Sequence, residues 1–350
     1  MAGPAQEGWD DQPAVVTVHD REQEIAAFLA RHGGGSAPAP LADDASFRRY
    51  WRVETRDVST VLMDAPPGKE DVGRFVAVAN YLRSVGFSAP EILAADPERG
   101  FVLLEDFGDE KLSTLAATGR IDWLHYEVAV DLLTDLHSRP PPSATPPYDE
   151  TLLLGEVSLF IDWYLPGVAE DPAPAVRRSF VELWRQVLRR YTSVRDVLVL
   201  LDYHADNLMW LAGRNGLAWL GLLDFQDAVA GHPAYDLVSL LEDARLDVDA
   251  ALAETMFNRY LTATERDPKS FGAAFAILGA QRNSKIIGIF TRLAVRDGKR
   301  RYLDLIPRVW RYLERDLAHP ELAQLRDWYQ RYVPPGVRDS AVSSAMETGR

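Results

Sequence analysis

The chain has 350 residues, of which 47% are hydrophobic and 26% charged, and this composition suits a soluble globular protein of one or two lobes. Its 52 acidic and 38 basic residues give a formal net charge of −14, which disfavours general binding to nucleic acid or to anionic membranes. The absence of cysteine excludes disulfides, thiolate zinc sites and cysteine nucleophiles. The sequence shows no signal peptide and no spanning stretch, so we expect a cytoplasmic protein, which we take to be a monomer.

The first third of the chain mixes strand and helix patterns. An amphipathic stretch with a helix N-cap begins at Asp20 and stops at a run of three glycines. Period-two alternation and a long amphipathic segment follow. Strands are expected within 46–54, 60–66, 91–96 and 100–107, and a helix over 70–86.

From Lys111 to about Tyr332 the hydrophobic periodicity is helical, with one exception. The exception, 197–228, holds two apolar strands on either side of Asn215-Gly216, a dipeptide typical of two-residue hairpin turns. The clearest helices are expected over 122–138, 174–192, 236–263, 271–294 and 303–317.

These patterns predict an α+β protein with a small β-rich N-terminal lobe and a larger helical C-terminal lobe. The expected divisions are a disordered tail (1–19), the N-terminal lobe (20–104), a hinge (105–111), the helical lobe with its hairpin (112–335) and a C-terminal tail (336–350).

Polar residues gather at one mouth of the expected hairpin. Asn207 precedes the first strand and Asp224 ends the second, so a hairpin brings them together, with Asp202 on the loop beside them. Phosphoryl transfer from ATP uses one carboxylate that accepts a hydroxyl proton, and an Asn with an Asp that hold Mg²⁺. We therefore predict Asp202 as the catalytic base and Asn207 with Asp224 as the metal ligands.

Other interpretations of these residues stay open. Asp and Asn at strand ends are ordinary turn formers. Asp206 competes for the role of base, but it adjoins Asn207, which leaves no loop to separate the base from the metal, and we favour Asp202. His204 either orients the loop and contacts the substrate or simply packs within it.

The segments LLDYHADNLMWL and GLLDFQDAVAGHPAYDL resemble the aminoglycoside phosphotransferase and choline kinase superfamily, which has the protein-kinase-like two-lobed fold. DASFRRYWRV, FVLLEDFGD and AQRNSKIIGIFTRL are similar to bacterial sugar kinases of peptidoglycan recycling. That resemblance implies ATP-dependent phosphorylation of the anomeric hydroxyl of N-acetylmuramate and N-acetylglucosamine. It also implies the same base and metal ligands.

By the same resemblance, the turn DASFRRY would cover the nucleotide phosphates and the hinge would meet adenine through its backbone. Met63 stands where relatives often carry a phosphate-pairing Lys or Arg, so Arg48 or Arg49 is expected to take over that role. Adjacent strand residues point to opposite faces, so at most one of the two should face the nucleotide. Glu70 either pairs with that cation or only favours the start of the helix. The full set of expected nucleotide contacts is Ser46, Phe47, Arg48, Arg49, Glu105, Asp106 and Phe107.

The acceptor site is expected among aromatic and polar residues of the helical lobe. Asp162, Trp163 and Tyr164 could hold a sugar by stacking and hydrogen bonding, or could be core residues at a helix end. Arg282 or Lys285, within a polar run in an apolar helix, could pair with the lactyl carboxylate of N-acetylmuramate. His204 and Gln226 complete the expected contacts, and Asp236 is expected to be a helix N-cap.

Two alternative functions remain at this stage. An aminoglycoside or other small-alcohol kinase would need several acids for a cationic substrate, and 241–250 could supply them, although it also suits a solvated helix end. A non-catalytic kinase-like binding module would explain the missing phosphate-pairing Lys, but it would have no use for a base and two metal ligands.

Overall fold

A computed structural model describes residues 18–34, 38–41, 48–56, 58–68, 70–168 and 172–338. Its chain forms two compact units, Met1–Val72 with Ile92–Asp106, and Gly73–Glu91 with Phe107–Arg350. The expected turn residues Ser46 and Phe47 and most of both expected tails lie outside the described residues. The lobe boundaries expected from the sequence stay predictions.

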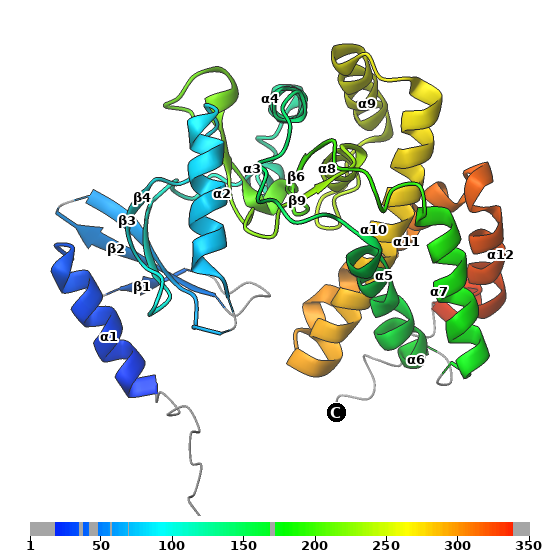
Figure 1. The fold of residues 1–350 in the computed structure, drawn as a ribbon, viewed down its shortest axis with the longest axis horizontal. Coiled ribbons are helices and arrows are strands. Elements are labelled where there is room, and N and C mark those ends of the chain that lie inside the picture. Colours follow the sequence, from blue (N-terminus) through cyan, green and yellow to red (C-terminus); the bar gives the residue numbers. More distant parts are fainter. Residues whose placement is uncertain are drawn as a thin grey trace, which may run out of the picture. The chain divides into compact units, whose positions relative to one another are not determined.

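The N-terminal unit is a five-stranded antiparallel sheet with one helix (Figure 1). Its strand order is β1-β2-β3-β5-β4, which confirms the four strands expected from alternation and adds the short β1. Helix α1 begins at Val18, two residues before the expected start. The elements are α1 (Val18–Arg31), β1 (Ala39–Pro40), β2 (Arg49–Thr55), β3 (Val58–Asp64), β4 (Ile92–Asp96) and β5 (Phe101–Glu105).

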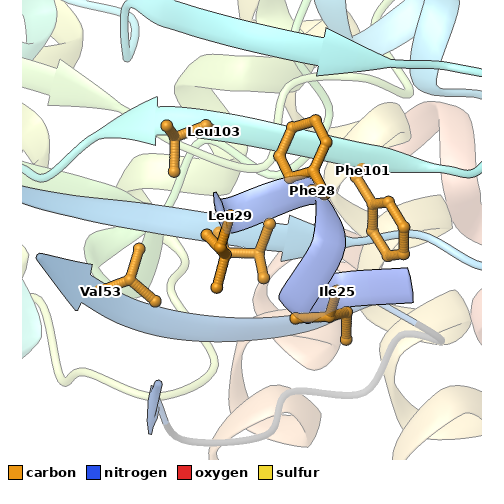
Figure 2. Packing of buried hydrophobic residues seen from close by; sticks show 7 residues of the cluster. Ile25, Phe28, Leu29, Val53, Phe101 and Leu103 are labelled. Carbon is orange, nitrogen blue, oxygen red and sulfur yellow. The ribbon is translucent and has the colours of Figure 1, made fainter. Parts of the chain in front are cut away.

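The apolar stripe of α1 packs against one face of this sheet (Figure 2). Phe28 and Leu29 lie three and four residues after Ile25, which places all three on one side of the helix. They meet alternate strand residues that point to the same face of the sheet, among them Leu62 and Phe101, both fully buried. This cluster is the core of the N-terminal unit.

The C-terminal unit is mainly helical, and the helices expected over 122–138, 174–192, 271–294 and 303–317 are confirmed. Its α-helices are α2 (Val72–Ser84, included from Gly73), α3 (Leu112–Ala117), α4 (Trp123–His137), α5 (Glu150–Leu159), α6 (Leu165–Val168), α7 (Pro174–Leu188), α8 (Ala234–Leu241), α9 (Ala250–Thr264), α10 (Pro268–Asp297), α11 (Ile306–Leu317) and α12 (Ala323–Tyr332). A π-helix, η1 (Phe160–Tyr164), and four 3₁₀ helices, η2 (Ala205–Asn207), η3 (Gly216–Trp219), η4 (Arg300–Leu305) and η5 (Pro320–Leu322), complete it. No helix in the described ranges is long and apolar enough to cross a membrane.

The single helix expected over 236–263 is wrong, because the chain turns between α8 and α9. The Asp249 carboxylate accepts hydrogen bonds from the backbone N–H groups of Ala251 and Leu252, which starts a new helix there. Glu242 and Asp243, just after α8, point inward and are almost fully buried. The acidic stretch 241–250 is therefore only partly the solvated turn that its charge suggests.

The expected two-residue hairpin is also wrong in its details. β7 (Leu208–Trp210) and β8 (Leu220–Leu222) do pair antiparallel, but η3 lies between them and Asn215-Gly216 does not join the strands directly. A backbone hydrogen bond from Leu211 to Trp219 and the contact of the Trp210 and Trp219 rings close this longer connection. The preceding apolar run forms β6 (Val197–Val199), which pairs with the distant β9 (Val229–Gly231).

Helix α10, 30 residues long, runs through the C-terminal unit and packs against α5, η1, α8 and α11 (Figure 1). At Gly288 the helix approaches the junction of α5 and η1 so closely that an added Cβ would lie 2.3 Å from the carbonyl carbon of Leu159. Only glycine fits there.

Candidate active site

A buried carboxylate accepts hydrogen bonds from the backbone of the loop that carries Asp202. The backbone N–H groups of Leu200 and Leu201 donate to the two oxygens of Asp236, at 2.7 and 2.9 Å. Asp236 lies within α8 and is fully buried, so the expected N-cap role is wrong. An acid inside the apolar stretch AYDLVSLL was the signal that could have revealed this role, because a buried charge needs donors.

The structure brings Asp202, Asn207 and Asp224 together. The Asn207 side-chain amide donates to the backbone carbonyl of Asp202 at 3.0 Å and to the Asp224 carboxylate at 3.5 Å. The backbone N–H of Leu223 donates to the Asn207 carbonyl at 2.9 Å, which ties the two strand ends together. The proximity expected from the sequence therefore exists, although the hairpin is built differently.

Asn207 and Asp224 offer the oxygen atoms that a small divalent cation prefers. The Asn207 Oδ1 atom makes no hydrogen bond to any residue that the structure describes, since the amide nitrogen takes both contacts above. Gln226 donates to the other Asp224 oxygen at 3.1 Å and so orients the carboxylate. Mg²⁺ usually takes only one or two protein ligands besides phosphate oxygens and water, so this pair fits it, while no cluster of three His, Asp or Glu suited to a metal occurs in the described ranges.

Asp202 stands in a setting that suits a proton acceptor. Burial raises the pKa of its carboxyl to about 6, with Lys285 opposing and Asp224 adding to the increase. A carboxylate with a raised pKa is a stronger base while remaining largely ionised near neutral pH.

The competing acid, Asp206, is engaged elsewhere. Its carboxylate forms an ion pair with the Arg245 Nε at 2.8 Å, and Arg245 also lies 3.2 Å from the His204 ring. Burial, with Arg245 and Arg282 nearby, lowers the pKa of His204 well below its usual range, so the ring is neutral. His204 lies 3.4 Å from the amide of Asn207, the candidate metal ligand, within the same loop.

Lys285 is neutralised by a neighbour in the same unit. Its Nζ donates to Glu156 at 2.7 Å, and Glu156 also accepts from Tyr148 and from Gln281. Arg282, three residues earlier on α10, is 3% exposed and donates from Nη1 to the Glu242 carbonyl at 3.5 Å.

The aromatic cluster expected to stack on a sugar lies apart from these contacts. Tyr164, in η1, is 2% exposed and its hydroxyl accepts from the Trp310 indole at 3.0 Å, so it is a core residue with no free face for a sugar. Asp162 is on the surface in an ion pair with Arg177. Trp163 is half-buried, and in the part of the chain that the structure describes no hydrogen bond or ring contact links it to Asp202.

In the N-terminal unit, Arg48 and Arg49 engage different carboxylates. Arg48 is 7% exposed and its Nε lies 3.6 Å from Glu70, while Arg49, half-exposed, pairs with Asp64 at 2.7 Å. Of the two sequence interpretations of Glu70, the ion pair with the candidate phosphate-binding cation is the one present. The expectation that the two arginines diverge agrees with these separate partners.

The expected hinge residues have distinct surroundings. The Asp106 carboxylate accepts from Arg52 at 2.6 Å and from Ser59 at 2.6 Å. Glu105 ends β5 and pairs in register with Thr60. Phe107 belongs to the C-terminal unit, where its ring covers Gly221 of β8 so closely that a Cβ there would lie 2.8 Å away.

Comparison with known proteins identifies the family. A model described as the phosphotransferase enzyme family matches residues 38–271. This chain belongs to that family. It is 37% identical to a protein of Caulobacter vibrioides named N-acetylmuramate/N-acetylglucosamine kinase, over 91% of this chain and 98% of the relative. A protein of Pseudomonas aeruginosa with the same name is 40% identical over 85% of this chain and 90% of the relative.

The fold agrees with this membership. An aminoglycoside phosphotransferase solved with ADP bound superposes with a TM-score of 0.58 at 12% identity, covering 85% of this chain and 99% of that one. The chain thus has the protein-kinase-like α+β fold expected from the sequence, and as a member of the phosphotransferase family it is an ATP-using enzyme.

Proposed function

We propose that this protein is an ATP- and Mg²⁺-dependent kinase that phosphorylates the anomeric hydroxyl of N-acetylmuramate and N-acetylglucosamine in the cytoplasm, as part of peptidoglycan recycling. The observation that carries the proposal is the group formed by Asp202, Asn207 and Asp224 in a chain that matches relatives of that name over most of its length. The net charge of −14 supports a small-molecule acceptor over nucleic acid or membrane, and the protein is proposed to act as a monomer.

The residues of the group divide the chemistry between them. Asp202 accepts the proton of the sugar hydroxyl as the oxygen attacks the terminal phosphate of ATP. An anomeric hydroxyl is more acidic than an ordinary alcohol, so a carboxylate with a pKa of about 6 suffices. Asn207 Oδ1 and the Asp224 carboxylate would hold Mg²⁺, which supplies positive charge for the phosphate oxygens. Gln226 keeps Asp224 in place.

The nucleotide side is proposed to use an arginine where relatives use lysine. Arg48 is buried and paired with Glu70, the arrangement that positions a phosphate-binding cation in kinase-like folds. The same ion pair supports a catalytic enzyme over a non-catalytic binding module, for which the missing lysine at Met63 was the main argument.

An aminoglycoside acceptor is disfavoured by the acidic stretch 241–250. A polycationic substrate would require free carboxylates, but Glu242 and Asp243 are buried and Asp247 pairs with Arg308 and Arg311. These acids are therefore committed to the protein itself.

A coupled assay of ADP release tests the proposal. With Mg-ATP, the acceptors would be N-acetylmuramate, N-acetylglucosamine, glucose, kanamycin and choline, and ³¹P NMR would locate the phosphate in any product. Turnover confined to the two N-acetyl sugars, with phosphate on C1, is the expected result. Turnover of kanamycin or choline instead would contradict the proposed acceptor while leaving the catalytic group intact.

A further inference from the structure

The polar run 281–285 in the middle of α10 contains one residue whose contacts differ from those of its neighbours. Four of the five residues form short side-chain hydrogen bonds within the protein, although the Gln281 Oε1 and Asn283 Oδ1 atoms are buried without a partner among the described residues. Gln281 donates to the Leu153 carbonyl at 3.1 Å, Asn283 to Glu242 at 2.6 Å and to Asp316 at 2.9 Å, Ser284 bonds the Tyr329 hydroxyl at 2.7 Å, and Lys285 bonds Glu156 at 2.7 Å. The exception is Arg282.

Arg282 is a buried cation without a carboxylate partner. It is 3% exposed, and its single hydrogen bond to a described residue is the long one from Nη1 to the Glu242 carbonyl. Its Nε and Nη2 donate to none of the residues described, and it forms no ion pair with any of them. By contrast, Lys285 is paired with Glu156 and Arg245 with Asp206.

Arg282 lies beside the loop that carries the proposed base. Its Nη1 donates to the carbonyl of Glu242, and the carboxylate of the next residue, Asp243, accepts a hydrogen bond from the backbone N–H of Ala205, within that loop, at 2.9 Å. The loop, Asp243 and α10 belong to the same compact unit. An anion bound by Arg282 would therefore lie beside the sugar hydroxyl that Asp202 activates.

A buried guanidinium that no described carboxylate bonds directly is costly, and a ligand carboxylate can supply the missing partner. The two proposed sugars differ in one group, the lactyl ether on C3 of N-acetylmuramate, which ends in a carboxylate. C3 is separated from the reacting C1 by a single ring carbon, so the lactyl group stays near the base. The planar guanidinium with free Nε and Nη2 matches a carboxylate in two-point geometry.

We propose that Arg282 binds the lactyl carboxylate of N-acetylmuramate and so determines the preference of the enzyme between its two sugars. This inference rests on the proposed function. It assigns to Arg282 the role that the sequence left open between Arg282 and Lys285, because Glu156 already neutralises Lys285.

The test compares kcat/KM for the two sugars in Arg282→Gln, Arg282→Lys and wild-type protein. Loss of a charge-assisted contact predicts a fall of roughly tenfold to a hundredfold for N-acetylmuramate in Arg282→Gln. The values for N-acetylglucosamine should change little. Arg282→Lys, which keeps the charge, should recover part of the loss, and the wild type should discriminate against N-acetylmuramate methyl ester by a similar factor without any substitution that could affect folding.

A matched control is Lys285→Gln on the same helix. This variant should leave the ratio of the two kcat/KM values unchanged, whatever its effect on each. Equal losses on both sugars in Arg282→Gln would overturn the proposal and assign Arg282 to the transferred phosphoryl group or to folding. Wild-type turnover of N-acetylglucosamine alone, or undiminished turnover of the methyl ester, would overturn the role of Arg282 without contradicting the kinase activity. If neither sugar were turned over, the proposed function itself would be overturned.

Discussion

Two groups of carboxylates in the C-terminal unit, Glu242 with Asp316 and Asp202 with Asp224, have very different surroundings. Glu242 and Asp316 are 0% and 3% exposed, and Asn283 donates to both while Arg315 donates to Glu242. Asp202 and Asp224 are only half-buried, and the nearby cation Arg282 forms no ion pair with any carboxylate in the described part of the chain. Buried polar groups of a stable core find their partners within the chain, whereas a site leaves capacity for a ligand. The comparison separates a group of acids that stabilises the fold from one that we propose takes part in catalysis.

The largest expected effect comes from removing the proposed base. Asp202→Asn should keep nucleotide binding but lower kcat by roughly 10²- to 10⁴-fold, the usual contribution of general base catalysis. Asp206→Asn is the matched control, since that acid is tied to Arg245. Steady-state kinetics and nucleotide titration measure both. Near-normal turnover in Asp202→Asn with a collapse in Asp206→Asn would transfer the role of base to Asp206.

A smaller loss is expected at the metal ligands. Gln226→Leu removes the donor that orients Asp224 and should weaken the apparent affinity for Mg²⁺ by roughly 10- to 100-fold. Asp224→Ala should weaken it further, since a ligand itself is lost. Titration of Mg²⁺ in a nucleotide-binding assay gives both values, and an unchanged metal dependence in Asp224→Ala would show that the metal is held elsewhere.

In the buried group of carboxylates, Asn283→Ala should lower the free energy of unfolding but leave catalysis unchanged. It leaves two buried carboxylates without their shared donor, and an unsatisfied buried group costs about 1–3 kcal/mol. Urea unfolding should record the loss, while KM for the sugars stays unchanged at temperatures where the variant is folded. A selective rise in KM for N-acetylmuramate would instead make Asn283 part of the acceptor site.

The smallest effect concerns the pH dependence of stability. Burial and the neighbouring Glu242 carboxylate raise the pKa of Asp316 well above its usual range. The folded state therefore keeps a proton that the unfolded chain releases above about pH 4, so this pair lowers stability as pH rises from there towards the folded-state value. Asp316→Asn should remove that slope and gain on the order of 1 kcal/mol at pH 8. Melting curves from pH 5 to 8 that fall as steeply as the wild type would contradict this account.

The sequence predicts those features of the fold and the site that depend on residues close together along the chain. The strands of the N-terminal sheet, the end of α2 before Gly86 and the spacing of Asp202, Asn207 and Asp224 all follow from local patterns, and the structure contains them. The pairing of β6 with β9 and the hold of Asp236 on the amides of Leu200 and Leu201 join segments some 30 residues apart, and local patterns do not encode them.

The polar run of α10 is predictable from the sequence only in part. Its sequence shows that buried polar groups need partners, but not which of them the fold supplies. Asn283 bonds the carboxylates of Glu242 and Asp316, while Arg282, one residue earlier, bonds only the backbone carbonyl of Glu242 among the described residues. The partners that the neighbouring elements place around α10, which local sequence patterns do not encode, make the difference between the two residues.

The backbone on both sides of the catalytic loop has a consequence for the evolution of this enzyme. Leu201 and Asp224 have φ angles of +69° and +56°, a region that costs residues with a side chain about 1–3 kcal/mol each. Leu201→Gly and Asp224→Gly would both relax this strain, but only the first spares the proposed metal ligand. Selection for heat resistance alone would therefore favour a change at position 224 that selection for the proposed activity would reject, so thermostability and the proposed turnover oppose each other at that residue.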